Sequence, residues 1–189
     1  MPFTPPPPLK AGLFGRTMGA PAKPKAAPAA GAIAPPPRPK GIPIEHRIGV
    51  QAPAEVIWQL IYDLEGWSRW NPTYPRAAGE IRLGATLDMT LTLPGRDPQE
   101  IQPVVLEWVP NEQLHWKLSL MNGLVKTIRY IEIEQLAEAS CIVSNGEIFA
   151  GVLGKTVVKQ AGGAIRRGFM AMNEALKEQA EAAWRARQA

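Results

Sequence analysis

The chain has 189 residues and a formal net charge of +4, but its charges are unevenly distributed. Residues 1–40 contain six of the 21 Lys and Arg residues and no acidic residue, so the remainder holds 15 basic and 17 acidic residues and has a net charge of −2. This excludes overall basicity as a reason to expect nucleic-acid binding by the folded part. The one cysteine, Cys141, excludes an internal disulfide and a thiolate metal cluster.

The first 43 residues differ in composition from the rest. They contain 13 of the 20 prolines, which cannot join a helix interior or a central strand. They also have too few large apolar side chains to offset the entropy of ordering the chain. We therefore expect residues 1–43 to be a disordered Pro/Ala-rich tail, partly polyproline II, that at most binds a partner weakly. Residues 44–187 suffice for one domain with its own core.

The folded part begins with a strand and a helix. Residues 44–50 alternate apolar and polar positions, which predicts a strand. Pro53 then suits the first turn of a helix, and Gly66 is expected to end it. A short turn that contains Trp67 and Trp70 follows.

Several strands are expected next, and then one long helix. Alternating patterns predict strands over residues 86–93, 101–109, 113–121, 124–136 and 140–150. The short turns between them imply antiparallel pairing, and Asn122-Gly123 is a strong type I′ hairpin signal. Residues 152–184 predict a helix, because apolar side chains recur every three or four positions at Leu153, Val157, Ala161, Ile165, Phe169, Met172 and Leu176.

The turns also predict which side chains share a face of the sheet. A two-residue turn at Asn122-Gly123 places Trp116 opposite Arg129. A three-residue turn at residues 137–139 places Leu136 opposite Ser140 and Arg129 opposite Glu147. Side chains alternate between faces, so Trp116, Arg129 and Glu147 are expected on the apolar, helix-facing side. Because a buried charge is costly without a partner, we hypothesise an Arg129–Glu147 pair, which either holds two strands together or contacts a ligand.

Five stretches together resemble one protein family. They are residues 52–58 (APAEVIW), 63–72 (DLEGWSRWNP), 80–87 (EIRLGATL), 144–151 (SNGEIFAG) and 168–177 (GFMAMNEALK). This pattern resembles the START-like, or SRPBCC, superfamily in its polyketide cyclase/dehydrase-like branch. The resemblance implies an α+β helix-grip fold: a seven-stranded antiparallel sheet wrapped round the long C-terminal helix, with two short helices after the first strand. It also implies a cavity for apolar small molecules. Asn145 departs from the pattern, because relatives often have His there, which weakens any inference of acid–base chemistry.

The sequence offers little support for catalysis or for a cofactor. His46 and His115 are the only histidines and have no metal-ligand spacing, and no nucleophile motif is present. The glycines of residues 151–154 lie between a strand and a helix, but they are not preceded by the glycine that a phosphate loop needs. We predict no cofactor, no metal and no catalytic residue.

The expected function is therefore binding of a hydrophobic or amphipathic small molecule, such as a lipid, a polyketide or an aromatic compound, between the sheet and the helix. Candidate cavity residues are Trp67, Trp70, Met89, Leu91, Leu106, Trp116, Leu118, Arg129, Ile131, Asn145, Glu147, Phe149, Ile165 and Phe169. Trp67 and Trp70 form either a lid or a plug. One alternative is a cyclase/aromatase-type enzyme in which Glu147 moves protons, and another is an interaction module whose cavity its own side chains fill. We expect a cytoplasmic protein, since no run of 18 apolar residues occurs.

Overall fold

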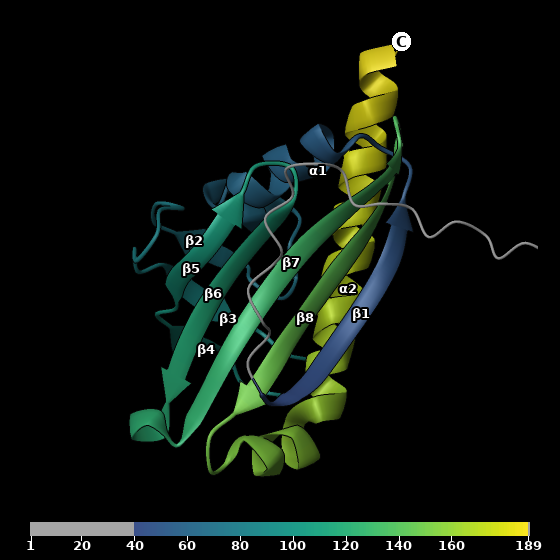
Figure 1. The fold of residues 1–189 in the computed structure, drawn as a ribbon. Coiled ribbons are helices and arrows are strands. Elements are labelled where there is room, and N and C mark those ends of the chain that lie inside the picture. The colour runs from purple at the N-terminus through teal and green to yellow at the C-terminus, as the bar shows by residue number, and fades with distance from the viewer. Residues whose placement is uncertain (1–39, 189) are drawn as a thin grey trace, which may run out of the picture. The chain divides into compact units, whose positions relative to one another are not determined.

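The computed structural model describes residues 40–188. In this part of the chain a strand and two short helices precede seven further strands and a long C-terminal helix (Figure 1). Of the tail predicted over residues 1–43, residues 1–39 lie outside the described residues. At its end the prediction is wrong, because Ile42 and Pro43 already belong to the first strand, Ile42–Val50, where they pair with the last strand of the sheet.

Five strands form the larger antiparallel sheet. Its order is β1-β8-β7-β6-β5, and the strands are β1 Ile42–Val50, β5 Val104–Val109, β6 Gln113–Leu120, β7 Val125–Ala137 and β8 Ser140–Ala150. The short 3₁₀ element η2, Met121–Gly123, joins β6 to β7. β1 pairs with β8, so that Ile42 lies opposite Phe149 and Val50 opposite Cys141.

The register of the central strands is the predicted one. Trp116 lies opposite Arg129, and Arg129 lies opposite Glu147. In the β6–β7 turn Asn122 has a φ of 54° and Gly123 a φ of 86°. A type I′ turn requires the left-handed region at both central residues, so the turn signal in the sequence is confirmed together with the register that it implies.

The prediction for the β7–β8 turn is wrong by one residue. Ala137 pairs with Ser140 and Gln135 with Cys141, so Leu136 is the additional residue of a bulge and does not lie opposite Ser140. A bulge absorbs one residue and restores the register beyond it. The faces assigned to the rest of β7 are therefore unaffected.

Three short strands form the smaller sheet in the order β2-β3-β4: β2 Arg76–Ala78, β3 Asp88–Leu91 and β4 Gln99–Ile101. The single strand expected over residues 101–109 is broken at Pro103, which has no N–H to donate to a ladder. Its carbonyl still accepts a hydrogen bond from the Leu87 N–H at 2.9 Å, and Thr86 bridges to Val104. The chain thus passes from the smaller sheet to the larger one at this proline.

Two short helices follow β1, as expected. Helix α1, Ala54–Tyr62, begins directly after Pro53, but it ends before Gly66, and the 3₁₀ helix η1 spans Glu65–Arg69. The indole N–H of Trp67 lies 3.1 Å from the carbonyl oxygens of both Leu60 and Ile61. It therefore caps the last turn of α1, where carbonyl groups have no partner within the helix.

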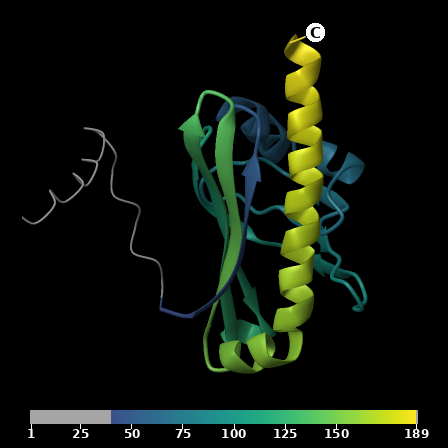
Figure 2. The ribbon, with the colours of Figure 1, turned by 90° about the vertical axis from the view of Figure 1, so that its right-hand side faces the viewer.

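The long helix α2, Gly154–Gln188, lies along one face of the larger sheet (Figure 2), which we call the inner face. Ile165, Phe169, Met172 and Leu176 are buried, as their spacing predicts. At Gly168 the helix lies close to the β3–β4 loop, because a Cβ atom there would be 2.9 Å from a methyl group of Leu93.

The predicted α+β class and the arrangement of an antiparallel sheet around a C-terminal helix are confirmed. Within residues 40–188 the strands number eight in two sheets, and not seven. The alternating patterns predicted six strands, and the two additional ones are β2, which is too short to show such a pattern, and the second strand that the break at Pro103 creates.

Candidate functional site

Arg129 lies on the inner face of β7, at the centre of the space between sheet and helix. Its side chain is 2% exposed. Nη1 donates to the carbonyl oxygens of Gly146 (2.8 Å) and Tyr130 (3.3 Å), and Nε donates to the Tyr74 hydroxyl (3.3 Å). Hydrogen bonds of this kind are what allow a charged group to be buried.

Three aromatic rings also surround the guanidinium group. Its carbon lies 3.8 Å from the ring centroid of Phe169, 5.6 Å from that of Trp116 and 5.9 Å from that of Tyr74. Contacts between a cation and a ring face within about 6 Å are attractive, most strongly when both groups are desolvated. Arg129 is therefore held by carbonyls and rings.

The hypothesised Arg129–Glu147 ion pair does not form. Both side chains belong to the inner face, but among the described residues neither is within ion-pair distance of a charged partner. The physical reason is that the Gly146 and Tyr130 carbonyls already accept from Arg129. Arg129 still acts on Glu147 at longer range, because its positive charge lowers the pKa of that carboxyl.

Glu147 is enclosed by protein, yet part of its surface stays accessible. Burial raises the pKa of its carboxyl, and the charge of Arg129 and the nearby Thr127 hydroxyl offset this only in part. Thr127 Oγ1 and Asn145 Oδ1 are buried and have no hydrogen-bond partner among residues 40–188. Buried polar atoms without a partner are rare, so these two stand out among the polar groups of the inner face.

Aromatic side chains pack together around Trp67 of η1, which follows α1. Trp67 is fully buried, and its ring centroid lies 5.9 Å from that of Trp70, 5.7 Å from that of Tyr74 and 6.4 Å from that of Trp116. These are normal separations for packed aromatic pairs. Trp67 is thus part of a packed aromatic cluster, which agrees with the role of a plug predicted for it more than with that of a lid.

The lower half of the interior is less tightly closed. Here Ile44, Phe149, Ile165 and Phe169 form a buried apolar cluster, against which the partly buried Leu93, Val157, Val158 and Ala161 pack. Two adjoining grooves of about 330 and 540 Å³ lie where the β3–β4 loop meets α2. Arg96 borders both grooves and donates to the Gln160 carbonyl of α2 at 2.8 Å. Leu93 lines one of these grooves and also packs against the apolar cluster.

A chain of amide groups crosses from the interior to β1. Asn145 Nδ2 donates to Asn173 Oδ1 at 3.0 Å, and Asn173 Nδ2 lies 3.0 Å from His46 Nδ1 and 3.1 Å from the His46 carbonyl oxygen. Sequence reasoning missed Asn173 and the role of His46. The available signal was an Asn inside the apolar stripe of the last helix, which requires a buried partner.

The fourteen candidate residues fall into two groups. Met89, Trp67, Trp116, Arg129, Ile131, Asn145, Phe149, Ile165 and Phe169 are buried, whereas Trp70, Leu91, Leu106, Leu118 and Glu147 are partly exposed. Leu106 lies at a bulge in β5 between Val105 and Glu107. A role in ligand binding stays a prediction for all fourteen. Thr127 and Tyr74 are additional polar residues of the same region.

Other titratable groups lie away from this interior. His115 is on the outer face, as the alternation predicts, with Nε2 3.2 Å from Glu132 and Nδ1 3.8 Å from Glu107. Within residues 40–188 no three His, Cys, Asp or Glu side chains are placed to hold a metal ion. In the same range, no helix combines the length and the apolar character that crossing a bilayer requires.

Solved structures with the same fold include enzymes. The Zhui aromatase/cyclase from Streptomyces sp. R1128 is 16% identical with a TM-score of 0.62, covering 75% of this chain and 94% of that one. Norcoclaurine synthase from Thalictrum flavum is 19% identical with a TM-score of 0.57, covering 74% and 86%. The di-domain aromatase/cyclase BexL of the BE-7585A biosynthetic pathway is 16% identical with a TM-score of 0.58 over 71% of this chain, which spans only 46% of that protein. At these identities the likeness concerns the fold.

No curated protein matches the sequence significantly. A family model does match: residues 42–181 fit the family described as polyketide cyclase/dehydrase and lipid transport. The match covers both sheets and most of α2, including Arg129, Glu147 and Asn173. The chain therefore belongs to the polyketide cyclase/dehydrase and lipid transport family.

Proposed function

We propose that the protein binds an uncharged amphipathic or apolar small molecule between the lower half of the larger sheet and the first half of α2. The observation that carries this proposal is the polar pair that Glu147 and Asn145 form on the inner face of β8: burial raises the pKa of Glu147, and the buried Asn145 Oδ1 has no hydrogen-bond partner among residues 40–188. A buried oxygen without a protein partner can accept a hydrogen bond from a ligand or a water molecule.

The surroundings of Glu147 favour a neutral polar group on the ligand. A raised pKa keeps the carboxyl protonated over a wider pH range, so that it can donate a hydrogen bond to a carbonyl or hydroxyl oxygen. The Thr127 hydroxyl lies beside the same carboxyl and lowers its pKa, so it belongs to the same polar group of the interior. Arg129 is less available, since its donors already bind protein carbonyls.

The apolar part of the ligand would lie against Phe149, Ile165, Val157 and Ala161, of which the last two are only partly buried. The grooves beside Leu93 and Arg96 are the nearest openings. Most of the affinity would come from apolar area removed from water, at about 25 cal/mol per Å², and the polar end would supply orientation.

Native mass spectrometry tests this proposal directly. A small molecule that is purified with the protein would be released by denaturation and identified. Ala161→Trp places a large ring in the lower half and is expected to abolish the bound species. Ala182→Trp, at an exposed position of the same helix, is expected to retain it. Equal retention by both variants, or no stabilisation of the protein by any ligand of a lipid and aromatic panel, would contradict the proposal.

The same site supports a second candidate function, a cyclase or dehydratase reaction. The specific observation is the raised pKa of Glu147 on the same face as Arg129, since a carboxyl with a raised pKa is better suited to serve as a general acid toward a carbonyl group. Glu147→Gln separates the two functions. Gln still donates a hydrogen bond, so binding is expected to persist, whereas a reaction that needs proton transfer would be lost.

A further inference from the structure

One end of the larger sheet combines exposed apolar residues with unpaired lysines. This end, which we call the lower tip, consists of residues 117–126 around the β6–β7 turn and residues 150–159 around the β8–α2 turn. The two turns are joined, because the Leu153 N–H donates to the Leu124 carbonyl oxygen at 3.1 Å. A Cβ atom on Gly151, whose φ is 86°, would lie 2.5 Å from the same oxygen, so the contact requires glycine.

The apolar side chains of the lower tip project away from the core. The exposed fractions are 84% for Val152, 61% for Met121, 45% for Leu124 and 36% for Leu120. Single exposed apolar residues are common on protein surfaces, but a contiguous group on two joined turns marks an interaction site. None of these four side chains is needed to fill the interior.

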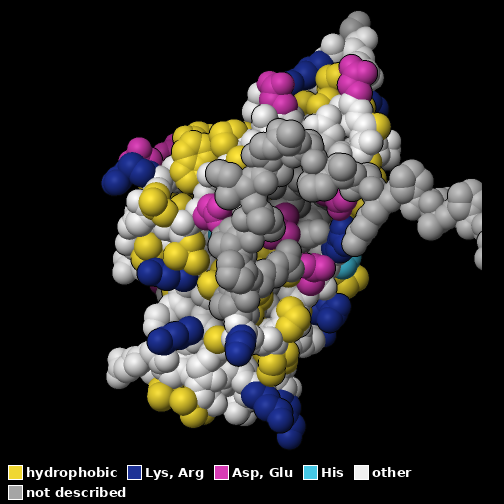
Figure 3. Space-filling view, in the orientation of Figure 1, with side chains coloured by type: hydrophobic (Ala, Val, Ile, Leu, Met, Phe, Trp, Pro, Cys, Tyr) yellow, Lys and Arg dark blue, Asp and Glu magenta, His cyan; other side chains and the backbone are white. Residues whose placement is uncertain are grey.

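The charges around the lower tip have one sign. Residues 117–126 and 150–159 contain Lys117, Lys126, Lys155 and Lys159 and no acidic residue. All four lysines are exposed, and none forms an ion pair with another described residue. Figure 3 shows hydrophobic and basic side chains at this end, whereas the acidic side chains of the same view lie in the upper and middle parts.

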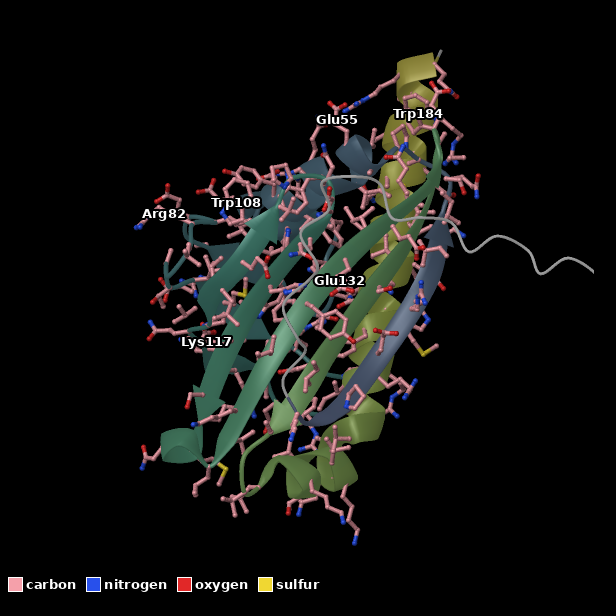
Figure 4. All side chains as sticks on the ribbon, in the orientation of Figure 1. Glu55, Arg82, Trp108, Lys117, Glu132 and Trp184 are labelled. Carbon is pink, nitrogen blue, oxygen red and sulfur yellow. The ribbon has the colours of Figure 1, made fainter. Side chains whose placement is uncertain are left out.

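An apolar groove continues the surface onto the outer face of the sheet. It measures about 530 Å³, and its floor includes Val104, Ile128 and Ile148. Lys117 and Lys126 border it on β6 and β7. Figure 4 places Lys117 well away from Glu55 and Trp184, which mark the opposite end of the molecule.

We propose that the lower tip docks on the surface of a lipid bilayer that carries anionic headgroups. Apolar side chains at a protrusion can enter the boundary between headgroups and acyl chains, and the surrounding lysines remain at headgroup level. Basic residues near an anionic membrane contribute about 1 kcal/mol each, which corresponds to about a fivefold gain in affinity per lysine. The one-signed charge favours this partner over an apolar protein surface, which would leave four lysines uncompensated.

Sedimentation of the full-length protein with vesicles tests the proposal. One vesicle contains phosphatidylcholine alone, and the other contains in addition about 30% phosphatidylserine, which supplies the surface potential. We expect at least tenfold stronger binding to the anionic vesicle, and weaker binding as salt is raised from about 50 to about 300 mM. Replacing all four lysines by Gln is expected to lower the affinity at least a hundredfold.

Matched variants separate the lower tip from the basic N-terminal residues, which stay in every variant. Val152→Asp and Met121→Asp are expected to lower binding about tenfold each, since they add a negative charge and remove apolar contact. Leu136→Asp, an exposed apolar position at the opposite end of β7, is expected to change it less than twofold. Circular dichroism would check that each variant is folded.

The proposal is overturned if anionic vesicles do not bind the protein, or if the tip variants and Leu136→Asp behave alike. It is also overturned if the lower tip proves to bind a protein and no lipid.

Discussion

The contact between Arg129 and Phe169 should be worth a measurable free energy of its own. The guanidinium carbon lies 3.8 Å from the Phe169 ring centroid, and both side chains are almost completely buried. Desolvated cation–π contacts reach about 2 kcal/mol, whereas contacts near the 6 Å limit contribute less. Phe169 should therefore couple to Arg129 more strongly than Trp116, whose centroid is 5.6 Å away.

A double-mutant cycle isolates this term. Phe169→Leu keeps most of the apolar volume and should cost about 1 to 1.5 kcal/mol for the change of shape, plus the lost ring contact. Arg129→Met removes the charge and leaves the Gly146 carbonyl without its donor, which costs about 1 to 3 kcal/mol. In the double variant the ring contact is lost only once, so the two single costs should exceed the double cost by about 1 to 2 kcal/mol.

Urea unfolding followed by tryptophan fluorescence gives the required free energies, provided that the slope with denaturant is unchanged. Phe149→Leu is the matched control, because Phe149 belongs to the same buried cluster but is not among the rings around Arg129. Its cycle with Arg129→Met should be additive within about 0.5 kcal/mol. Equal coupling energies for Phe169 and Phe149 would refute the assignment of a specific ring contact.

Three further outcomes follow from the structure. Burial raises the pKa of the Glu147 carboxyl in the folded protein above its value in the unfolded chain, which is about 4.3. The folded protein therefore favours the protonated carboxyl. The stability that this gives is fully present below the pKa of the unfolded chain and is lost as the pH rises through the pKa of the folded protein. Glu147→Gln has no carboxyl at this position and should not lose stability in this way. The urea concentration at the unfolding midpoint should therefore be higher for the variant than for the original protein at high pH, and the difference between the two should become smaller as the pH falls. Gly163→Ala, where a Cβ atom makes only ordinary contact, should raise stability by about 0.5 to 1 kcal/mol. Gly168→Ala should raise it less, because its Cβ would lie 2.9 Å from the end of the Leu93 side chain, which has to shift; thermal melts of both variants check this order. Asn173→Ala should cost about 2 to 3 kcal/mol in urea unfolding, because it leaves buried partners without hydrogen bonds.

Local turn chemistry made the inner face predictable. The Asn122-Gly123 pair sets the β6–β7 register, and through it the shared face of Trp116, Arg129 and Glu147. Spacing alone also identified the buried stripe of α2. These features are predictable because period and turn type depend on residues that are close in sequence.

The remaining features depend on contacts that are distant in sequence. Arg129 and Glu147 were expected to pair because they lie opposite each other, but main-chain carbonyls satisfy the guanidinium instead. Asn173 of α2 forms hydrogen bonds with residues of two strands, Asn145 of β8 and His46 of β1. The position of Asn173 in the apolar stripe of the helix does not identify these partners. The bulge at Leu136 changed one pairing only, that of Ser140. It could not be predicted, because a single additional residue at the end of a strand leaves no periodic pattern in the sequence.

The pairing of β1 with β8 also constrains how the protein folds during synthesis. The first described strand must wait for its partner until residues 141–149 have been made. The inner face then stays uncovered until the ribosome has released α2, the last element of the chain. Pairings between such distant segments form slowly, and uncovered apolar sheets are prone to aggregation. A nascent chain that is stopped before α2 should therefore depend on chaperones, although all eight described strands are already present.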